Sequence, residues 1–173
     1  MDINKIKESI RNVPDFPKKG IQFKDITPLL MDPILYNHVI KILINRYQSM
    51  KIDVIIGIES RGFIFAGPLA LNLNCSFALA RKKGKLPYKT VKANYELEYG
   101  EDFLELHKDS INPGDSVLVV DDLLATGGTT KAVIQMVEQL NGNILEVAYL
   151  IELANLKGSD KFKDKNIFSI VKY

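Results

Sequence analysis

Residues 117–130 read VLVVDDLLATGGTT, and this stretch decides the fold. The four apolar residues at its start are typical of a buried parallel strand. Two carboxylates follow, and a short loop with two glycines then leads into a helical pattern at residues 129–140. A strand, a glycine-bearing loop and a helix in direct succession indicate an open α/β sheet, in which ligands bind at the carboxyl ends of the strands.

Two further apolar runs, at residues 54–56 and 147–151, resemble buried strands of the same sheet. A helical pattern over residues 63–73 follows the first of them, and we expect Pro68 either to distort that helix or to lie near its start. The predicted fold is therefore α/β, with an open, mainly parallel twisted sheet flanked by helices.

The N-terminal part of the chain has a different pattern. Isoleucines at helical spacing predict a short helix over residues 3–10, and prolines and a glycine over residues 14–20 predict an irregular arm. Asp32 and Pro33 have the residue types of a helix cap and a first helical position, so they predict a helix that runs to about Tyr47.

Residues 82–107 interrupt the strand–helix units. Lysines and a glycine lead into apolar residues that alternate with acidic ones over residues 95–99 and again at 104–106. This alternation is typical of a β-hairpin, and its polar, basic approach predicts a flexible flap.

Length and charge limit the classes of protein to which the chain can belong. Its 173 residues fit one domain, and a net charge of +2 gives no strong field for nucleic acid or a membrane surface. The single cysteine, Cys75, excludes an internal disulfide and favours a reducing compartment. No signal-peptide pattern and no run of ~20 apolar residues is present, so we expect a cytoplasmic protein with neither a nucleic-acid nor a membrane partner.

The loop after the two acids has the composition of a phosphate site. Gly127 and Gly128 let the backbone approach an anion, nearby threonines add hydroxyl groups, and the helix N-terminus provides free N–H groups. Asp121 and Asp122 would repel a phosphate but can accept hydrogen bonds from the diol of a ribose. A sugar phosphate satisfies both, whereas the alternative is a loop that only turns the chain and caps a helix. The pattern Gly-x-x-x-x-Gly-Lys-Ser/Thr of a P-loop is absent.

The stretch VLVVDDLLATGGTT resembles the phosphoribosyl pyrophosphate signature of type I phosphoribosyltransferases. The resemblance implies that ribose and its 5-phosphate are bound by Asp121, Asp122, Ala125, Thr126, Gly127, Gly128 and Thr129. It also assigns the loop at residues 57–62 to pyrophosphate, through Glu59, Ser60 and Arg61, with a cis peptide bond between Glu59 and Ser60. Basic residues leading into the flap, Arg81, Lys82 and Lys85, are expected to help bind the same pyrophosphate.

Residues 13–30, 95–100 and 156–158 are similar to the adenine phosphoribosyltransferases of that family. The similarity implies that Phe23 stacks on adenine, that the backbone of Gln22 and Lys24 reads its edge, and that Leu156 packs on the base. The chain departs from the family's usual residues at Lys19, Gln22, Lys24 and Lys83. Because recognition there uses the backbone, these departures bear on tuning more than on the identity of the base.

The implied reaction is a step of purine salvage, in which adenine and 5-phosphoribosyl 1-pyrophosphate give AMP and pyrophosphate. The expected catalytic residues are Glu98, which would manage the adenine proton, Tyr99 and Arg61. Mg²⁺ is expected as the cofactor, held mainly by substrate oxygens and water without direct protein ligands. A homodimer is expected from the resemblance alone.

Two alternatives stay open at this point. One is a phosphoribosyltransferase for another purine base, and the other is a non-catalytic regulator of the same fold that senses a ligand. In either case we expect residues 1–173 to form a single domain, in which residues 1–32 supply the N-terminal helix and adenine-binding arm and residues 82–107 supply the flap.

Overall fold

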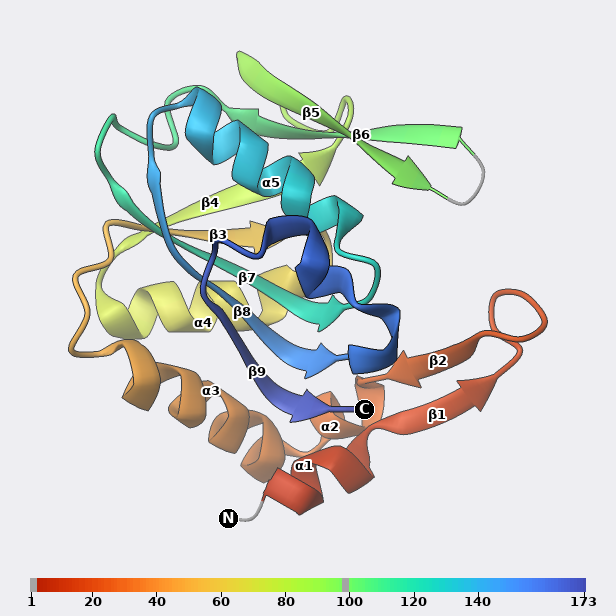
Figure 1. Cartoon of the computed structure of the whole chain (residues 1–173). Helices are drawn as coiled ribbons and strands as arrows, with labels where there is room; N and C mark the ends of the chain where they lie inside the picture. Colours follow the sequence, from red (N-terminus) through yellow and green to blue (C-terminus); the bar gives the residue numbers. More distant parts are fainter. Residues whose placement is uncertain (1–2, 98–99) are drawn as a thin grey trace. The chain divides into compact units, whose positions relative to one another are not determined.

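The computed structural model describes residues 3–97 and 100–173 (Figure 1). These fall into two compact units, Met1–Arg46 and Tyr47–Tyr173. None of the helices in the described ranges has the length and apolarity needed to cross a membrane.

The larger unit is built on a seven-stranded sheet with the strand order β5-β6-β4-β3-β7-β8-β9. Five neighbouring strands, from β4 to β9, are parallel, and β5 and β6 extend the sheet as an antiparallel hairpin. The strands are β3 (Val54–Ile58), β4 (Ser76–Lys82), β5 (Thr90–Leu97), β6 (Gly100–His107), β7 (Ser116–Leu124), β8 (Asn143–Glu152) and β9 (Ile167–Lys172). The mainly parallel α/β sheet expected from the sequence is confirmed.

Helices α4 (Gly62–Leu73) and α5 (Gly128–Gln139) cover opposite faces of this sheet (Figure 1). Helix α4 connects β3 to β4 in one direction, and α5 connects β7 to β8 in the other. Because such crossovers are right-handed, two crossovers that run in opposite directions bring their helices to opposite faces. The carboxyl ends of β3 and β7 therefore lie side by side, and each leads into the N-terminus of a different helix.

Alternation along the strands decides which side chains face each helix. Ile56 of β3 and Val119 of β7 join the apolar core that includes Val133 and Val137 of α5. Gly57 faces α4, where an added Cβ would lie 2.9 Å from Phe63, so this glycine permits close packing of the helix on the sheet. Pro68 lies inside α4 beyond its first turn and thus not near its start.

The smaller unit contains α1 (Ile3–Ser9), α2 (Thr27–Met31) and most of α3 (Pro33–Tyr47). Asp32 Oδ1 accepts hydrogen bonds from the N–H groups of Ile34 (2.9 Å) and Leu35 (3.1 Å), which confirms the predicted cap of α3.

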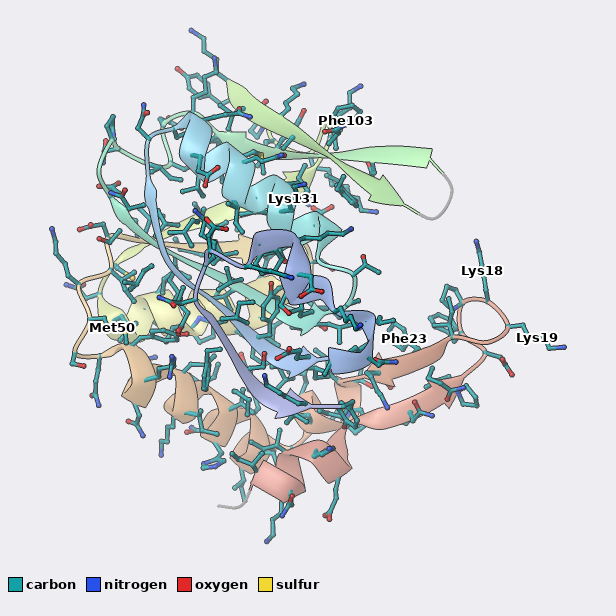
Figure 2. The ribbon with its side chains drawn as sticks, in the orientation of Figure 1. Lys18, Lys19, Phe23, Met50, Phe103 and Lys131 are labelled. Carbon is teal, nitrogen blue, oxygen red and sulfur yellow. The ribbon has the colours of Figure 1, made fainter. Side chains whose placement is uncertain are left out.

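The predicted irregular arm corresponds to the loop between two short antiparallel strands, which the sequence did not predict. These are β1 (Arg11–Pro14) and β2 (Gln22–Asp25), with Lys18 and Lys19 in the loop between them (Figure 2). Each strand has four residues and mostly exposed or half-exposed side chains, so neither carries the apolar alternation by which a strand is recognised.

The last strand supports the segment that follows β8. Tyr173 donates its N–H to the carbonyl of Glu152 and accepts from the N–H of Ala154, both at 2.9 Å. Two short 3₁₀ helices, η1 (Ala154–Leu156) and η2 (Gly158–Phe162), continue from this point. The N–H of Leu153 donates to the carbonyl of Leu124 at 2.9 Å, so the same segment is also tied to the end of β7.

Candidate functional site

Asp121 and Asp122 lie near the carboxyl end of β7, in the middle of the sheet. Adjacent residues of a strand point to opposite faces, and the two acids accordingly serve different surroundings. Asp121 lines a pocket of about 70 Å³ on the side of α5. Asp122 is 4% exposed and forms an ion pair with Arg61, whose Nε lies 2.8 Å from its Oδ2, at the start of α4.

The pocket beside Asp121 contains most of the residues predicted to hold a sugar phosphate. Its other lining residues are Leu123, Leu124, Ala125, Thr126, Gly127, Thr129 and Thr130. Gly127 caps α5 with φ +76°, a conformation that favours glycine, and the helix starts at Gly128. The pocket thus joins a carboxylate to hydroxyl groups and to the N-terminus of a twelve-residue helix, where an anion is stabilised.

Two supports of this loop have no clear signal in the sequence. Tyr149 of β8 is buried, and its hydroxyl shares a hydrogen bond of 2.7 Å with Thr130 Oγ1, which fixes the first turn of α5 from below. Gly158 packs backbone to backbone on the loop, because an added Cβ would overlap the carbonyl of Ala125, and one on Gly127 would overlap the carbonyl of Gly158. The nearest signal is the glycine of the stretch at residues 156–158, but its spacing does not reveal the contact.

Burial disfavours the charged form of both acids. It raises the pKa of Asp121 well above its usual value, and the neighbouring charge of Asp122 raises it further. Burial also raises the pKa of Asp122, although the Arg61 guanidinium opposes that shift. The pair therefore holds negative charge at a cost that hydroxyl donors or a cation would reduce.

Charged side chains dominate the loop after β3. The Glu59–Ser60 peptide bond is cis, as the resemblance implied. Glu59 accepts a hydrogen bond from Arg81 Nε at 2.8 Å, and its other oxygen lies 3.7 Å from Lys85 Nζ. Arg81 Nη1 also donates to the carbonyl of Lys85 at 3.2 Å. The structure thus brings Glu59, Arg81 and Lys85 together beside exposed Ser60.

Lys82 does not join this group. Its Nζ lies 3.6 Å from Asp102 of β6, and the next residue, Lys83, lies over the ring of Phe103 at 5.7 Å (Figure 2 labels Phe103 on β6). Asp102 also accepts from the hydroxyl of Tyr95 at 2.9 Å, and this bond, after burial, raises the pKa of Tyr95 to about 12. The cations predicted as one set are therefore divided between the β3 loop and the hairpin.

The predicted adenine residues occur in both units. Phe23 lies on β2 (Figure 2) with its ring edge-on to Phe16 at 5.1 Å, and the side chains of Gln22 and Lys24 both hydrogen-bond to Asn12. Leu156 lies in η1 of the larger unit and is 44% exposed. Glu98 and Tyr99, the expected catalytic pair of the flap, lie outside the described residues.

Comparison with known proteins identifies the family. Residues 26–173 match the phosphoribosyl transferase domain. The chain is 51% identical to adenine phosphoribosyltransferase of Halothermothrix orenii over 166 residues, covering 96% of this chain and 98% of that protein. It is 53% identical over 169 residues to the enzyme of the same name from Ruminiclostridium cellulolyticum, covering 97% and 99%.

Solved structures agree with these relatives. Adenine phosphoribosyltransferase of Thermoanaerobacter pseudethanolicus superposes with a TM-score of 0.96 at 47% identity, covering 99% of this chain and all of that one (100%). The Saccharomyces cerevisiae enzyme, complexed with an imino-altritol bisphosphate and adenine, has a TM-score of 0.92 at 40% identity and covers 98% of each chain. The fold and these relatives together establish that the chain belongs to the adenine phosphoribosyltransferases.

Proposed function

We propose that this chain transfers the 5-phosphoribosyl group of 5-phosphoribosyl 1-pyrophosphate to adenine, giving AMP and pyrophosphate in purine salvage. The observation that carries the proposal is the pocket in which Asp121 meets the glycine loop and the first turn of α5. A ribose 5-phosphate presents vicinal hydroxyls and a terminal phosphate, which match a carboxylate beside a helix N-terminus.

In this proposal the pocket at the end of β7 binds the ribose and its phosphate. Asp121 accepts hydrogen bonds from the ribose hydroxyls, and Asp122 on the other face orients Arg61 toward the donor. The remaining contacts to ribose and phosphate come from Ala125, Thr126, Gly127, Gly128 and Thr129. The high cost of holding charge on Asp121 supports the assignment, since hydroxyl donors would lower that cost.

Pyrophosphate is proposed to bind at the loop after β3. Ser60 and Arg61 would face it through backbone N–H groups and the guanidinium, while Lys82 would contribute from the end of β4. The Glu59 carboxylate would repel the anion directly, so its role is to hold Arg81 and Lys85 at the loop. In this proposal Glu59 belongs to the pyrophosphate subsite but does not contact the ligand.

Adenine is proposed to stack on Phe23 and to pack on Leu156, with its edge read by the backbone of Gln22 and Lys24. The exposure of Leu156 supports this role, because an apolar side chain left open beside the phosphate loop gains from covering by a base. Glu98 would handle the adenine proton, with Tyr99 and Arg61 completing the catalytic set.

Mg²⁺ fits this donor set as a substrate-bound ion. In the described ranges no three side chains of His, Cys, Asp or Glu cluster in a way that could hold a metal. Mg²⁺ commonly keeps several waters and binds through substrate phosphates and one or two carboxylates, and Asp121, which lines the proposed ribose pocket, would supply an acidic neighbour. The ion would neutralise charge on the leaving pyrophosphate.

We also propose a cytoplasmic homodimer built from single-domain chains of residues 1–173. Exposed apolar side chains on the larger unit support self-association: Leu71 of α4 is 82% exposed, and Phe77 of β4, in edge contact with Phe63, is 41% exposed. Sedimentation of the wild type and of Leu71→Glu tests this point, and a monomeric wild type would contradict it.

A base-competition assay tests the function. The purified chain with Mg²⁺ and 5-phosphoribosyl 1-pyrophosphate should release pyrophosphate with adenine and far more slowly with guanine or hypoxanthine, because a 6-oxopurine reverses the hydrogen-bonding polarity of the edge. Glu98→Gln should reduce the rate and leave donor binding intact. Faster turnover with guanine than with adenine would show that guanine is the substrate. Binding without turnover for any base would indicate a non-catalytic protein that senses a ligand.

A further inference from the structure

Glu105 is a buried carboxylate in the antiparallel part of the sheet. It lies on β6 and is 3% exposed. Lys92 of β5 approaches it with Nζ at 2.8 Å, and the backbone N–H of Gly84 donates to its Oε2 at 3.0 Å. The bond from Lys92 is the main reason that the pKa of Glu105 lies below its usual value, and the Gly84 N–H adds to the effect. The group is therefore a charged acceptor buried with two donors.

The strand register places Glu105 in a row of alternating charge. It pairs with Lys92 on one side and with Arg81 on the other, and directly opposed residues share one face of a sheet. Arg81 in turn binds Glu59 at the end of the neighbouring strand. The charge row, Lys92, Glu105, Arg81 and Glu59, thus runs from the edge strand to the proposed pyrophosphate loop.

The turn held by Glu105 carries Lys85 and directly follows Arg81 and Lys82 of β4. Gly84 has φ +79°, and the neighbouring N–H groups of Lys83 and Lys85 donate to the carbonyls of Phe103 (3.1 Å) and Lys82 (3.2 Å). Two bonds join this turn to side chains of the charge row: the Gly84 N–H donates to Glu105, and the Lys85 carbonyl accepts from Arg81. The position of Gly84 sets the position of the next residue, Lys85, and therefore how Lys85 and Arg81 contact Glu59.

We infer that Glu105 is a positioning residue for pyrophosphate binding, acting through the backbone of Gly84 and never touching the ligand. This inference rests on the proposed function, which assigns the cations of residues 81–85 to pyrophosphate. A fold alone does not require an acid here, because a buried ion pair can often be replaced by apolar residues without loss of stability. A preorganised anion site does require a fixed backbone, since small displacements of its donors are costly.

The test compares Glu105→Gln with Glu146→Gln. Glu146 is also a buried glutamate, 7% exposed, and it accepts a hydrogen bond from the Tyr47 hydroxyl at 2.6 Å on β8, away from the charge row. For each variant, the KM values for 5-phosphoribosyl 1-pyrophosphate and adenine, the inhibition constant of pyrophosphate and the thermal midpoint are measured. Direct titration of each protein with pyrophosphate by calorimetry completes the set.

Glu105→Gln should raise the donor KM and the pyrophosphate inhibition constant together, by about five- to tenfold. The neutral amide accepts a weaker hydrogen bond from Gly84 and no longer forms an ion pair with Lys92. The adenine KM should change by less than about twofold. Glu146→Gln should lower the thermal midpoint with no such split between substrates. Lys92→Gln, which keeps the Gly84 bond, should show the same split at a smaller size.

Equal changes in every constant, or an unchanged pyrophosphate titration in a folded Glu105→Gln, would overturn the inference. Should Glu105→Gln not fold, an unchanged pyrophosphate titration in Lys92→Gln would overturn it as well. Failure of the proposed function has a different signature, because the wild type itself would then form no AMP. In that event the calorimetric titration still decides whether Glu105 supports pyrophosphate binding.

Discussion

The two loops that leave the centre of the sheet are built on opposite principles. The loop after β7 carries no charged side chain, and its shape depends on backbone packing between Gly127 and Gly158. The loop after β3 is charged, and its side chains are already paired with partners of opposite sign, Glu59 with Arg81 and Arg61 with Asp122. Both lie at helix N-termini, so the fold alone does not account for the difference.

The difference matches the kind of anion that each loop is proposed to bind. A 5-phosphate stays on the sugar throughout the reaction, so a site made of backbone N–H groups and hydroxyls can hold it without change. Pyrophosphate must leave, and paired side chains can exchange one partner for another as it does. Substitutions in the first loop should therefore act through shape, and substitutions in the second should act through charge.

Gly127→Ala should have the largest effect. The new Cβ would overlap the Gly158 carbonyl, and the residue would also keep a positive φ that alanine disfavours. We expect catalytic efficiency to fall by about 100-fold, mainly through the donor, because the phosphate donors are displaced. Steady-state kinetics with the donor varied at saturating adenine measure the loss.

Gly114→Ala is the matched control for this variant. Gly114 also has a positive φ, +89°, but no atom lies within 4 Å of its added Cβ. It should lose stability by about 1 kcal/mol and keep its activity. Equal activity in the two variants would mean that the Gly127–Gly158 contact does not shape the pocket.

Arg61→Met should show a smaller, pH-dependent effect on stability. It leaves Asp122 buried without its cation, and we expect a loss of about 1–2 kcal/mol at pH 7, less than for a fully buried pair because the Arg61 side chain is 33% exposed. The pKa of Asp122 is already raised by burial and would rise further. A raised carboxyl pKa in the folded state means that stability falls as pH increases from the unfolded value, about 3.9, through the folded value.

The loss in Arg61→Met should therefore be small near pH 4 and grow toward pH 7. Urea unfolding of wild type and variant at several pH values across this range provides the measurement. A loss of the same size at every pH would show that the pair contributes through packing and not through charge.

Tyr149→Phe should have the smallest effect. It removes the hydroxyl that bonds to Thr130 and leaves the ring in place, so we expect a loss of stability of about 1 kcal/mol and an increase in the donor KM of a few fold. Thr130→Val and the double variant complete a thermodynamic cycle. Additive losses would indicate that the hydrogen bond does not couple β8 to the phosphate loop.

Patterns that repeat along the chain made the fold predictable. The apolar runs of β3, β7 and β8, together with the loops that follow β3 and β7, are enough to predict the parallel sheet from the sequence. Strands β1 and β2 were missed because four-residue strands with exposed side chains have no apolar period. The helical pattern of α4 was recognised in spite of Pro68. The helix tolerates this proline because the burial of neighbouring side chains outweighs one missing backbone donor.

The site was predictable where chemistry is local and unpredictable where it depends on packing. Asp121 and the glycine loop occur within one stretch and meet in one pocket. Strand alternation predicts that Asp121 and Asp122 face opposite sides of the sheet. The sequence does not show what lies on each side. Tyr149, Gly158 and Glu105 act across strands or between distant loops, and no spacing in the sequence announces such contacts.

The bonds between Tyr173 and the segment after β8 have a practical consequence for anyone handling the protein. Removing Tyr173 would break two of the bonds that hold the polypeptide presenting Leu156 and Gly158, well upstream in the chain. A purification tag fused directly after Tyr173 would crowd the same spot, so a flexible spacer or an N-terminal tag is the safer choice when affinities for the nucleobase are to be measured.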